Sequence, residues 1–134
     1  MAYRFIGHTA DIIVEGDGRN LAEAIEETAA GIIERIGRAD KEDVSFEFEE
    51  KAETLDELVV YSLSYILTGC ESRELQPHSF KVLELDAKGK EKRLKARIGA
   101  GKGKVKDVVK AVTYHEVSVE QKKGKAVVRV LLDI

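Results

Sequence analysis

A short polar cluster near the N-terminus, His8-Thr9-Ala10-Asp11, carries the residue types best suited to chemistry in this sequence. It lies between two apolar runs, residues 3–6 and 12–14, which both have the composition of strands, and Gly7 marks a turn before it. A polar cluster at a strand break needs hydrogen-bond partners for its buried atoms, or it binds a ligand. Asp11 is therefore the first candidate functional residue.

The end of the sequence supplies further carboxylates. Residues 127–134 have the composition of a strand, and Asp133 is followed by the last residue, Ile134. If this strand pairs beside one of the N-terminal strands, the Asp133 side chain and the terminal carboxylate of Ile134 come close to Asp11. Three ionised carboxylates repel one another unless a cation lies among them, and ligands that are all oxygen favour Ca²⁺ or Mg²⁺ over zinc. The alternative is that each aspartate only caps a turn or a strand end.

Three other segments carry chemically versatile residues in weaker patterns. Residues 99–104 alternate small residues with lysine, but no register has the spacing of a P-loop and no Ser or Thr follows. That segment is either a plain surface loop or a flexible basic loop that contacts phosphate or an acidic partner. His115 has no second histidine at helical spacing, and Cys70 has no histidine nearby in the sequence, so structural roles are expected for both.

Hydrophobic periodicity predicts the elements that position these residues. Helices are expected from the Asn20 cap to about residue 35 and from the Thr54 cap to about residue 69, each ending at a glycine. Strands are expected at about 2–6, 11–15, 44–49, 80–85, 93–98, 111–120 and 126–133, with a loop over 71–79 and an ambiguous segment at 105–109. This order indicates an α+β fold, a largely antiparallel sheet with two main helices packed on one face. The length predicts a single domain, 1–134.

Charge is unevenly distributed along the chain. The formal net charge is −3, but residues 1–80 hold 18 acidic and 7 basic residues, net −11, whereas residues 81–110 hold 11 basic and 4 acidic residues, net +7. This division fits contact with a polyanion or an acidic protein, and it equally fits a solvated surface. The acidic total disfavours a dedicated nucleic-acid binder. The lack of a signal peptide or long apolar run, together with the single Cys70, favours a cytoplasmic protein without a membrane segment.

Four motifs together resemble those of the archease family. They are FIGHTADI at residues 5–12, LAEA at 21–24, KAVTYH at 110–115 and LLDI at 131–134. Their order and the total length also fit. The resemblance implies an α+β protein cofactor of the RtcB-type RNA ligase, which joins tRNA halves during tRNA splicing, and not an enzyme in its own right. Such proteins promote guanylylation of the ligase histidine by GTP and allow the ligase multiple turnover.

The resemblance further implies a Ca²⁺ site formed by Asp11, Asp133 and the carboxylate end of Ile134, with Mg²⁺ as the alternative ion. Any contact with tRNA or GTP is expected to be weak or indirect. Two segments depart from the family's pattern: residues 61–65 contain no tryptophan, and residues 98–109 are rich in lysine and glycine where a longer polar segment with a histidine is common. These departures leave the cation ligands intact and concern the contact with the ligase.

Two other classes of function stay open at this stage. A metal-dependent phosphoesterase or nuclease would use Asp11, His8 and His115, and the pure protein would turn over RNA or phosphoesters. A general chaperone or RNA-binding module would use the basic stretch of residues 88–110. Its binding to many RNAs would depend steeply on salt concentration and would not require Asp11.

Overall fold

The computed structural model describes residues 1–7 and 11–134. Along these residues the elements are β1 (Tyr3–Gly7), β2 (Asp11–Gly18), α1 (Leu21–Ile36), β3 (Val44–Ala52), α2 (Leu55–Glu71), β4 (Gln76–Asp86), β5 (Lys92–Gly101), β6 (Ala111–Lys122) and β7 (Lys125–Asp133). One antiparallel sheet has the order β1-β2-β7-β6, and a second has the order β3-β5-β4. The predicted α+β class is confirmed, although the strands divide between two sheets.

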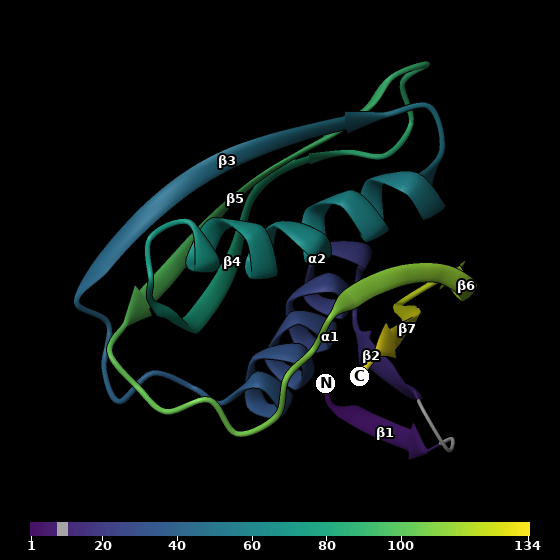
Figure 1. Cartoon of the computed structure of the whole chain (residues 1–134). Coiled ribbons are helices and arrows are strands. Elements are labelled where there is room, and N and C mark those ends of the chain that lie inside the picture. The colour runs from purple at the N-terminus through teal and green to yellow at the C-terminus, as the bar shows by residue number, and fades with distance from the viewer. Residues whose placement is uncertain (8–10) are drawn as a thin grey trace.

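Both helices lie between the two sheets (Figure 1). α1 packs against β1, β2 and β7 on one side and against β4 on the other, while α2 packs against β6 and against all three strands of the second sheet. One hydrophobic cluster joins these layers, and its largest fully buried side chains include Ile25, Ile32, Leu58, Leu63, Ile98 and Leu132. Because each helix is covered on two sides, most of its apolar residues are removed from water.

The helix starts predicted from the sequence are confirmed. The Asn20 side chain accepts a hydrogen bond from the Glu23 backbone N–H at 2.9 Å, and the Thr54 side chain accepts one from the Glu57 N–H at 3.1 Å. Each cap satisfies one of the backbone donors that a helix N-terminus leaves without a partner. α1 ends at Gly37, whose φ of 116° favours glycine, whereas α2 continues two residues past Gly69.

The boundaries of the second sheet differ from the sequence prediction. β4 begins at Gln76 and includes Pro77, which was expected in a loop. β4 is an edge strand, where a residue without an N–H is tolerated. β5 continues through Gly101, so only the latter part of the expected 99–104 loop is irregular. Residues 105–109 form neither helix nor strand. Within the described ranges, no helix is long and apolar enough to cross a membrane.

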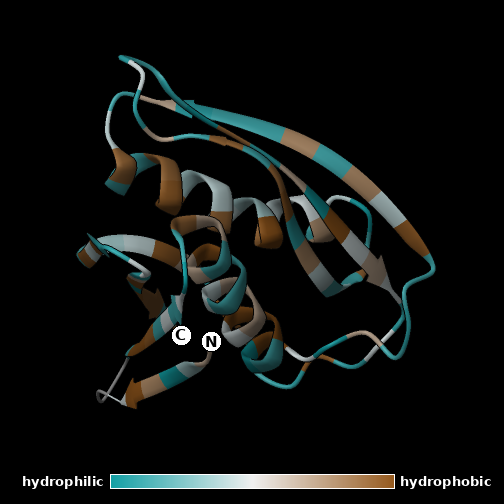
Figure 2. Cartoon of the chain, turned by 180° about the vertical axis from the view of Figure 1, so that it is seen from behind, coloured by the Kyte–Doolittle hydropathy of each residue, from teal (hydrophilic) through white to brown (hydrophobic). Residues whose placement is uncertain are grey.

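The second sheet places basic residues of β5 beside acidic residues of β3 and of the segment just before it. Hydrophilic and hydrophobic residues alternate along β3 (Figure 2), so one face of this strand is charged. The Lys95 ammonium lies 3.4 Å from the Glu47 carboxylate, and the Arg97 guanidinium lies 3.9 Å from that of Glu42. Acidic neighbours therefore offset the charges of Lys95 and Arg97. The alternative of an RNA-binding module that relies on the basic stretch of residues 88–110 stays a prediction.

Candidate metal centre

The pairing of β2 with β7 brings two of the predicted ligands together. These strands are antiparallel neighbours in the middle of the four-stranded sheet, and Asp11 is the direct cross-strand partner of Asp133. Residues directly opposite each other project from the same face of a sheet, with Cβ atoms about 5 Å apart. The prediction that the last strand lies beside an N-terminal strand is thus confirmed, and the neighbour is β2.

The face that carries Asp11 and Asp133 points away from α1. Gly16 of β2 faces the helix, since a Cβ added there would lie 2.4 Å from the backbone nitrogen of Thr28. Successive strand residues alternate between faces, so the odd-numbered residues of β2, Asp11 among them, lie on the other face. The acidic pair therefore lies on the face of the sheet that points away from the helices, where Asp11 is partly exposed and Asp133 is exposed.

One carboxylate oxygen of Asp11 has no hydrogen-bond partner among the described residues. Its Oδ1 atom is buried, and no hydrogen-bond donor among the described residues reaches it. A buried acceptor of this kind costs free energy, and a like charge directly opposite adds repulsion. The neighbouring backbone is held in place, because the Lys110 N–H donates to the Asp133 carbonyl oxygen at 2.7 Å. A cation would satisfy the Oδ1 atom and remove the repulsion.

The oxygen atoms at this end of the sheet fit a hard divalent cation. Carboxylate oxygens are the ligands that Ca²⁺ and Mg²⁺ prefer. Within residues 1–7 and 11–134, no group of three or more His, Cys, Asp or Glu side chains is arranged to hold a metal ion. A complete site would therefore need donors besides the two aspartates, such as the terminal carboxylate of Ile134 next to Asp133. Ca²⁺ and Mg²⁺ also commonly keep water ligands.

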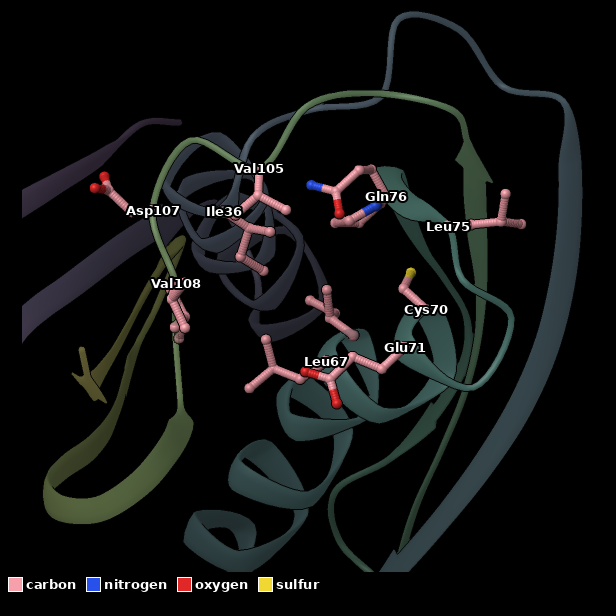
Figure 3. A pocket seen from close by; sticks show the side chains of 12 residues that line it. Ile36, Leu67, Cys70, Glu71, Leu75, Gln76, Val105, Asp107 and Val108 are labelled. Atoms are coloured by element: carbon pink, nitrogen blue, oxygen red, sulfur yellow. The ribbon is translucent and has the colours of Figure 1, made fainter.

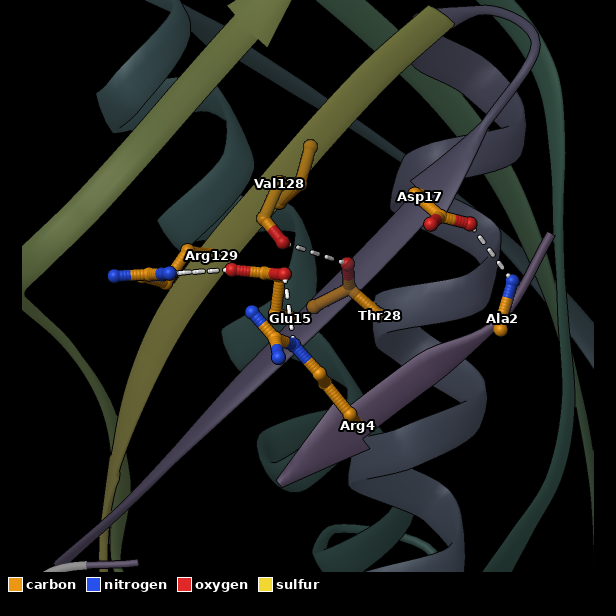
Figure 4. A network of polar contacts seen from close by, with 7 residues as sticks. All are labelled: Ala2, Arg4, Glu15, Asp17, Thr28, Val128 and Arg129. Atoms are coloured by element: carbon orange, nitrogen blue, oxygen red, sulfur yellow. Dashed lines mark hydrogen bonds and ion pairs between the residues drawn. The ribbon is translucent and has the colours of Figure 1, made fainter. Parts of the chain in front are cut away.

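A second carboxylate of β2, that of Glu15, has arginine partners. It lies four residues beyond Asp11 on the same face, with Arg4 of β1 on one side and Arg129 of β7 on the other (Figure 4). The Arg4 Nε lies 3.0 Å from Glu15 Oε1, and the Arg129 Nε lies 3.0 Å from Oε2. The hydrogen bond from Arg129, assisted by Arg4, holds the pKa of Glu15 below its ordinary value. Among the described residues Asp11 has no such arginine.

This network predicts a stability change in acid. A carboxylate whose pKa is lowered by folding stabilises the protein above its unfolded-state pKa, near 4.5, and that stability is lost as the pH falls below it. Glu15→Gln is expected to cost about 1 kcal/mol at pH 7, because both arginines are partly exposed. It should cost nothing once Glu15 of the wild type is protonated. Urea unfolding at pH 7, 5 and 3 measures this, and a constant difference at all three values would contradict it.

The other predicted residues do not join the acidic pair. His8 lies outside the described residues. His115 is exposed in β6, within a β-bulge between Thr113 and Ser118 where Glu116 has a φ of 57°. Among the described residues, no three His, Cys, Asp or Glu side chains are grouped to hold a metal ion, and the phosphoesterase alternative stays a prediction. The sequence signalled neither this bulge nor the buried Thr113 hydroxyl, which has no partner among the described residues.

The remaining candidates have structural roles. Cys70 is buried, and burial raises the pKa of its thiol to about 11, so it is a poor nucleophile at neutral pH. In the 99–104 segment, the Lys102 N–H donates to the Asp43 carboxylate at 3.3 Å. A Cβ at Gly101 would lie 2.2 Å from the Lys41 carbonyl oxygen. A phosphate-binding loop needs backbone N–H groups that are free to bind the anion. Here an acidic side chain and a backbone carbonyl group occupy the space beside this segment.

The geometry defines a class of small α+β protein: two antiparallel sheets enclose two helices, and an acidic pair lies at the end of the larger sheet. The solution structure of Methanobacterium thermoautotrophicum protein 1598 has this fold, with a TM-score of 0.82 at 25% identity over 99% of both chains. A Thermotoga maritima crystal structure, described as an archease and possible chaperone, matches with a TM-score of 0.63 at 22% identity over 96% of this chain and 94% of that one.

Sequence comparison gives the family. The model of the archease protein family (MTH1598/TM1083) matches residues 3–134. The protein archease of Sulfolobus acidocaldarius is 32% identical over 98% of both chains, and that of Pyrococcus abyssi is 32% identical over 85% of this chain and 84% of its own. This chain belongs to the archease family, as its motifs predicted.

Proposed function

We propose that this protein is an accessory factor of an RtcB-type tRNA-splicing RNA ligase in the cytoplasm. It promotes the GTP-dependent guanylylation of the ligase and its multiple turnover, and it is not an enzyme by itself. Membership of the archease family supports the proposal. The observation that carries it is the pairing of Asp11 with Asp133, with a buried carboxylate oxygen that lacks a donor among the described residues.

The residues of this chain would act by holding a divalent cation at an accessible sheet end. Asp11 and Asp133 are the side-chain ligands, and the terminal carboxylate of Ile134 is the third protein donor; Ca²⁺ is the proposed ion and Mg²⁺ the alternative. The β2–β7 pairing and the hydrogen bond from Lys110 set the spacing of the ligands before any partner arrives. A bound cation supplies positive charge that offsets phosphate charge during nucleotidyl transfer.

Ligation of split tRNA by a limiting amount of the RtcB-type ligase from the same source, with GTP, tests the proposal. With this protein present, the product should exceed the ligase concentration, and without it the reaction should stop near one turnover. An active ligase whose yield is unchanged by the protein would contradict the proposed function. Cleavage of RNA by the pure protein would instead support the phosphoesterase alternative.

A further inference from the structure

An apolar pocket lies where the C-terminal ends of both helices meet the irregular segment before β6 (Figure 3). Its volume is about 220 Å³, and its walls come from Ile36 of α1, from Leu67 and Cys70 of α2, and from Val105 and Val108 of the irregular segment. An engineered cavity of about 150 Å³ binds benzene, so this volume accommodates one large aliphatic or aromatic side chain.

Two apolar side chains at the mouth of the pocket are exposed to solvent. Val105 is 59% exposed and Val108 is 67% exposed, although both belong to the wall. The segment that carries them is tied to α1: the Lys106 N–H donates to the Ile36 carbonyl oxygen at 2.7 Å, and Arg35 forms an ion pair with Asp107 at 3.2 Å. The pocket is therefore preformed, which lowers the entropy cost of filling it.

The charged residues that line the pocket are both acidic. Figure 3 shows both side chains at the pocket. Asp107 is paired with Arg35, but Glu71 forms no ion pair with the described residues. An occupant that places a cation beside its apolar group would pair with Glu71 at the edge of an apolar surface. Charge complementarity thus selects a polypeptide segment in which a large apolar residue lies next to Lys or Arg.

The pocket adjoins the candidate metal centre along the backbone. Val109, in the pocket wall, directly precedes Lys110, whose N–H donates to the carbonyl oxygen of Asp133. The pocket wall is thus one residue along the chain from the backbone that contacts Asp133. The two features can therefore belong to one interface.

We propose that this pocket is the anchor site for the partner ligase, which inserts one large apolar side chain and pairs an adjacent Lys or Arg with Glu71. The inference rests on the proposed function and names the surface through which it operates. Buried apolar anchors at the centre of an interface commonly carry much of its affinity. The acidic pair would then position the reactive end of the complex, and the pocket would hold the two proteins together.

Direct binding of the purified ligase to this protein, measured by surface plasmon resonance, tests the inference. Val108→Lys places a cation at the mouth of the pocket and should weaken binding at least about 10-fold, and Glu71→Lys should do the same. Leu83→Lys is the matched control, because Leu83 is a 42% exposed residue of β4 that does not line the pocket; it should bind within about twofold of the wild type. Thermal unfolding verifies that all three variants are folded.

The outcomes separate the two proposals. If the wild type binds the ligase and Val108→Lys binds equally well, the anchor site is wrong and the proposed function stands. If the wild type does not bind or activate the ligase, both are wrong. If sedimentation shows that the wild type self-associates and Val108→Lys does not, while ligase binding is unchanged, the occupant is a second copy of this chain, which also overturns the inference.

Discussion

Asp11→Ala is expected to remove most of the stabilisation of the protein by Ca²⁺. A ligand present at 100 times its dissociation constant adds about 2.7 kcal/mol to the stability of the folded state, which corresponds to a rise of roughly 5–10 °C in the thermal midpoint. Loss of one of the two paired aspartates should weaken the affinity at least about 100-fold and remove most of this rise. Thermal unfolding with excess Ca²⁺ and with EDTA measures the effect.

Without the cation, Asp11→Ala should be no less stable than the wild type. In EDTA the wild type keeps the repulsion between Asp11 and Asp133 and a buried carboxylate oxygen without a donor among the described residues. Asp11→Ala removes both, so it should be as stable as the wild type or up to about 1 kcal/mol more stable. Asp17→Ala is the control on the same face of β2, where the carboxylate accepts a hydrogen bond from the Ala2 N–H. It should keep the response to Ca²⁺.

Two results would count against the metal centre. One is an equal response to Ca²⁺ in the wild type and in Asp11→Ala. The other is full activation of the ligase by Asp11→Ala under conditions where it binds no cation. The second result would leave the family assignment intact and would limit Asp11 to a structural role at the end of β2.

Gly16→Val is expected to destabilise the protein strongly. A Cβ at this position would lie 2.4 Å from both the backbone nitrogen and the hydroxyl of Thr28, and 2.9 Å from the Ala24 carbonyl oxygen. Since backbone atoms cannot move aside as a flexible side chain can, β2 would have to separate from α1. The expected cost is about 3 kcal/mol or more, measured as a lower midpoint of urea unfolding.

Gly7→Val is the matched control in the adjacent strand. A Cβ at Gly7 meets no atom of the described residues within 4 Å, so this substitution should cost less than about 1 kcal/mol. The strand that carries Gly16 also carries Asp11, so any Gly16→Val protein that remains folded should bind Ca²⁺ more weakly. Equal stability of the two variants would show that the close packing of β2 on α1 does not limit stability.

Local signals in the sequence predicted most of the elements. The Asn20 and Thr54 caps, the apolar spacing of both helices and the alternation along residues 44–49 each depend on residues a few positions apart. Predictions were weakest where the backbone depends on distant contacts. Pro77 joins β4 because that strand lies at a sheet edge, and Gly101 stays in β5 because residues near 41 approach it closely.

For the candidate metal centre too, the sequence predicted one part and only the tertiary structure decided the other. The sequence by itself determined which residues have the chemistry for a hard cation: Asp11 after an apolar run, and Asp133 and Ile134 at the end of the chain. Only the tertiary structure decided that β7 pairs with β2 in the register that sets Asp11 opposite Asp133. The tertiary structure alone also placed Glu15 between two arginines and paired the basic strand β5 with β3. It also formed the apolar pocket, to which residues 105–109 contribute one wall. Strand partners and register depend on which apolar faces are buried together across long separations in sequence, and no local pattern encodes that choice.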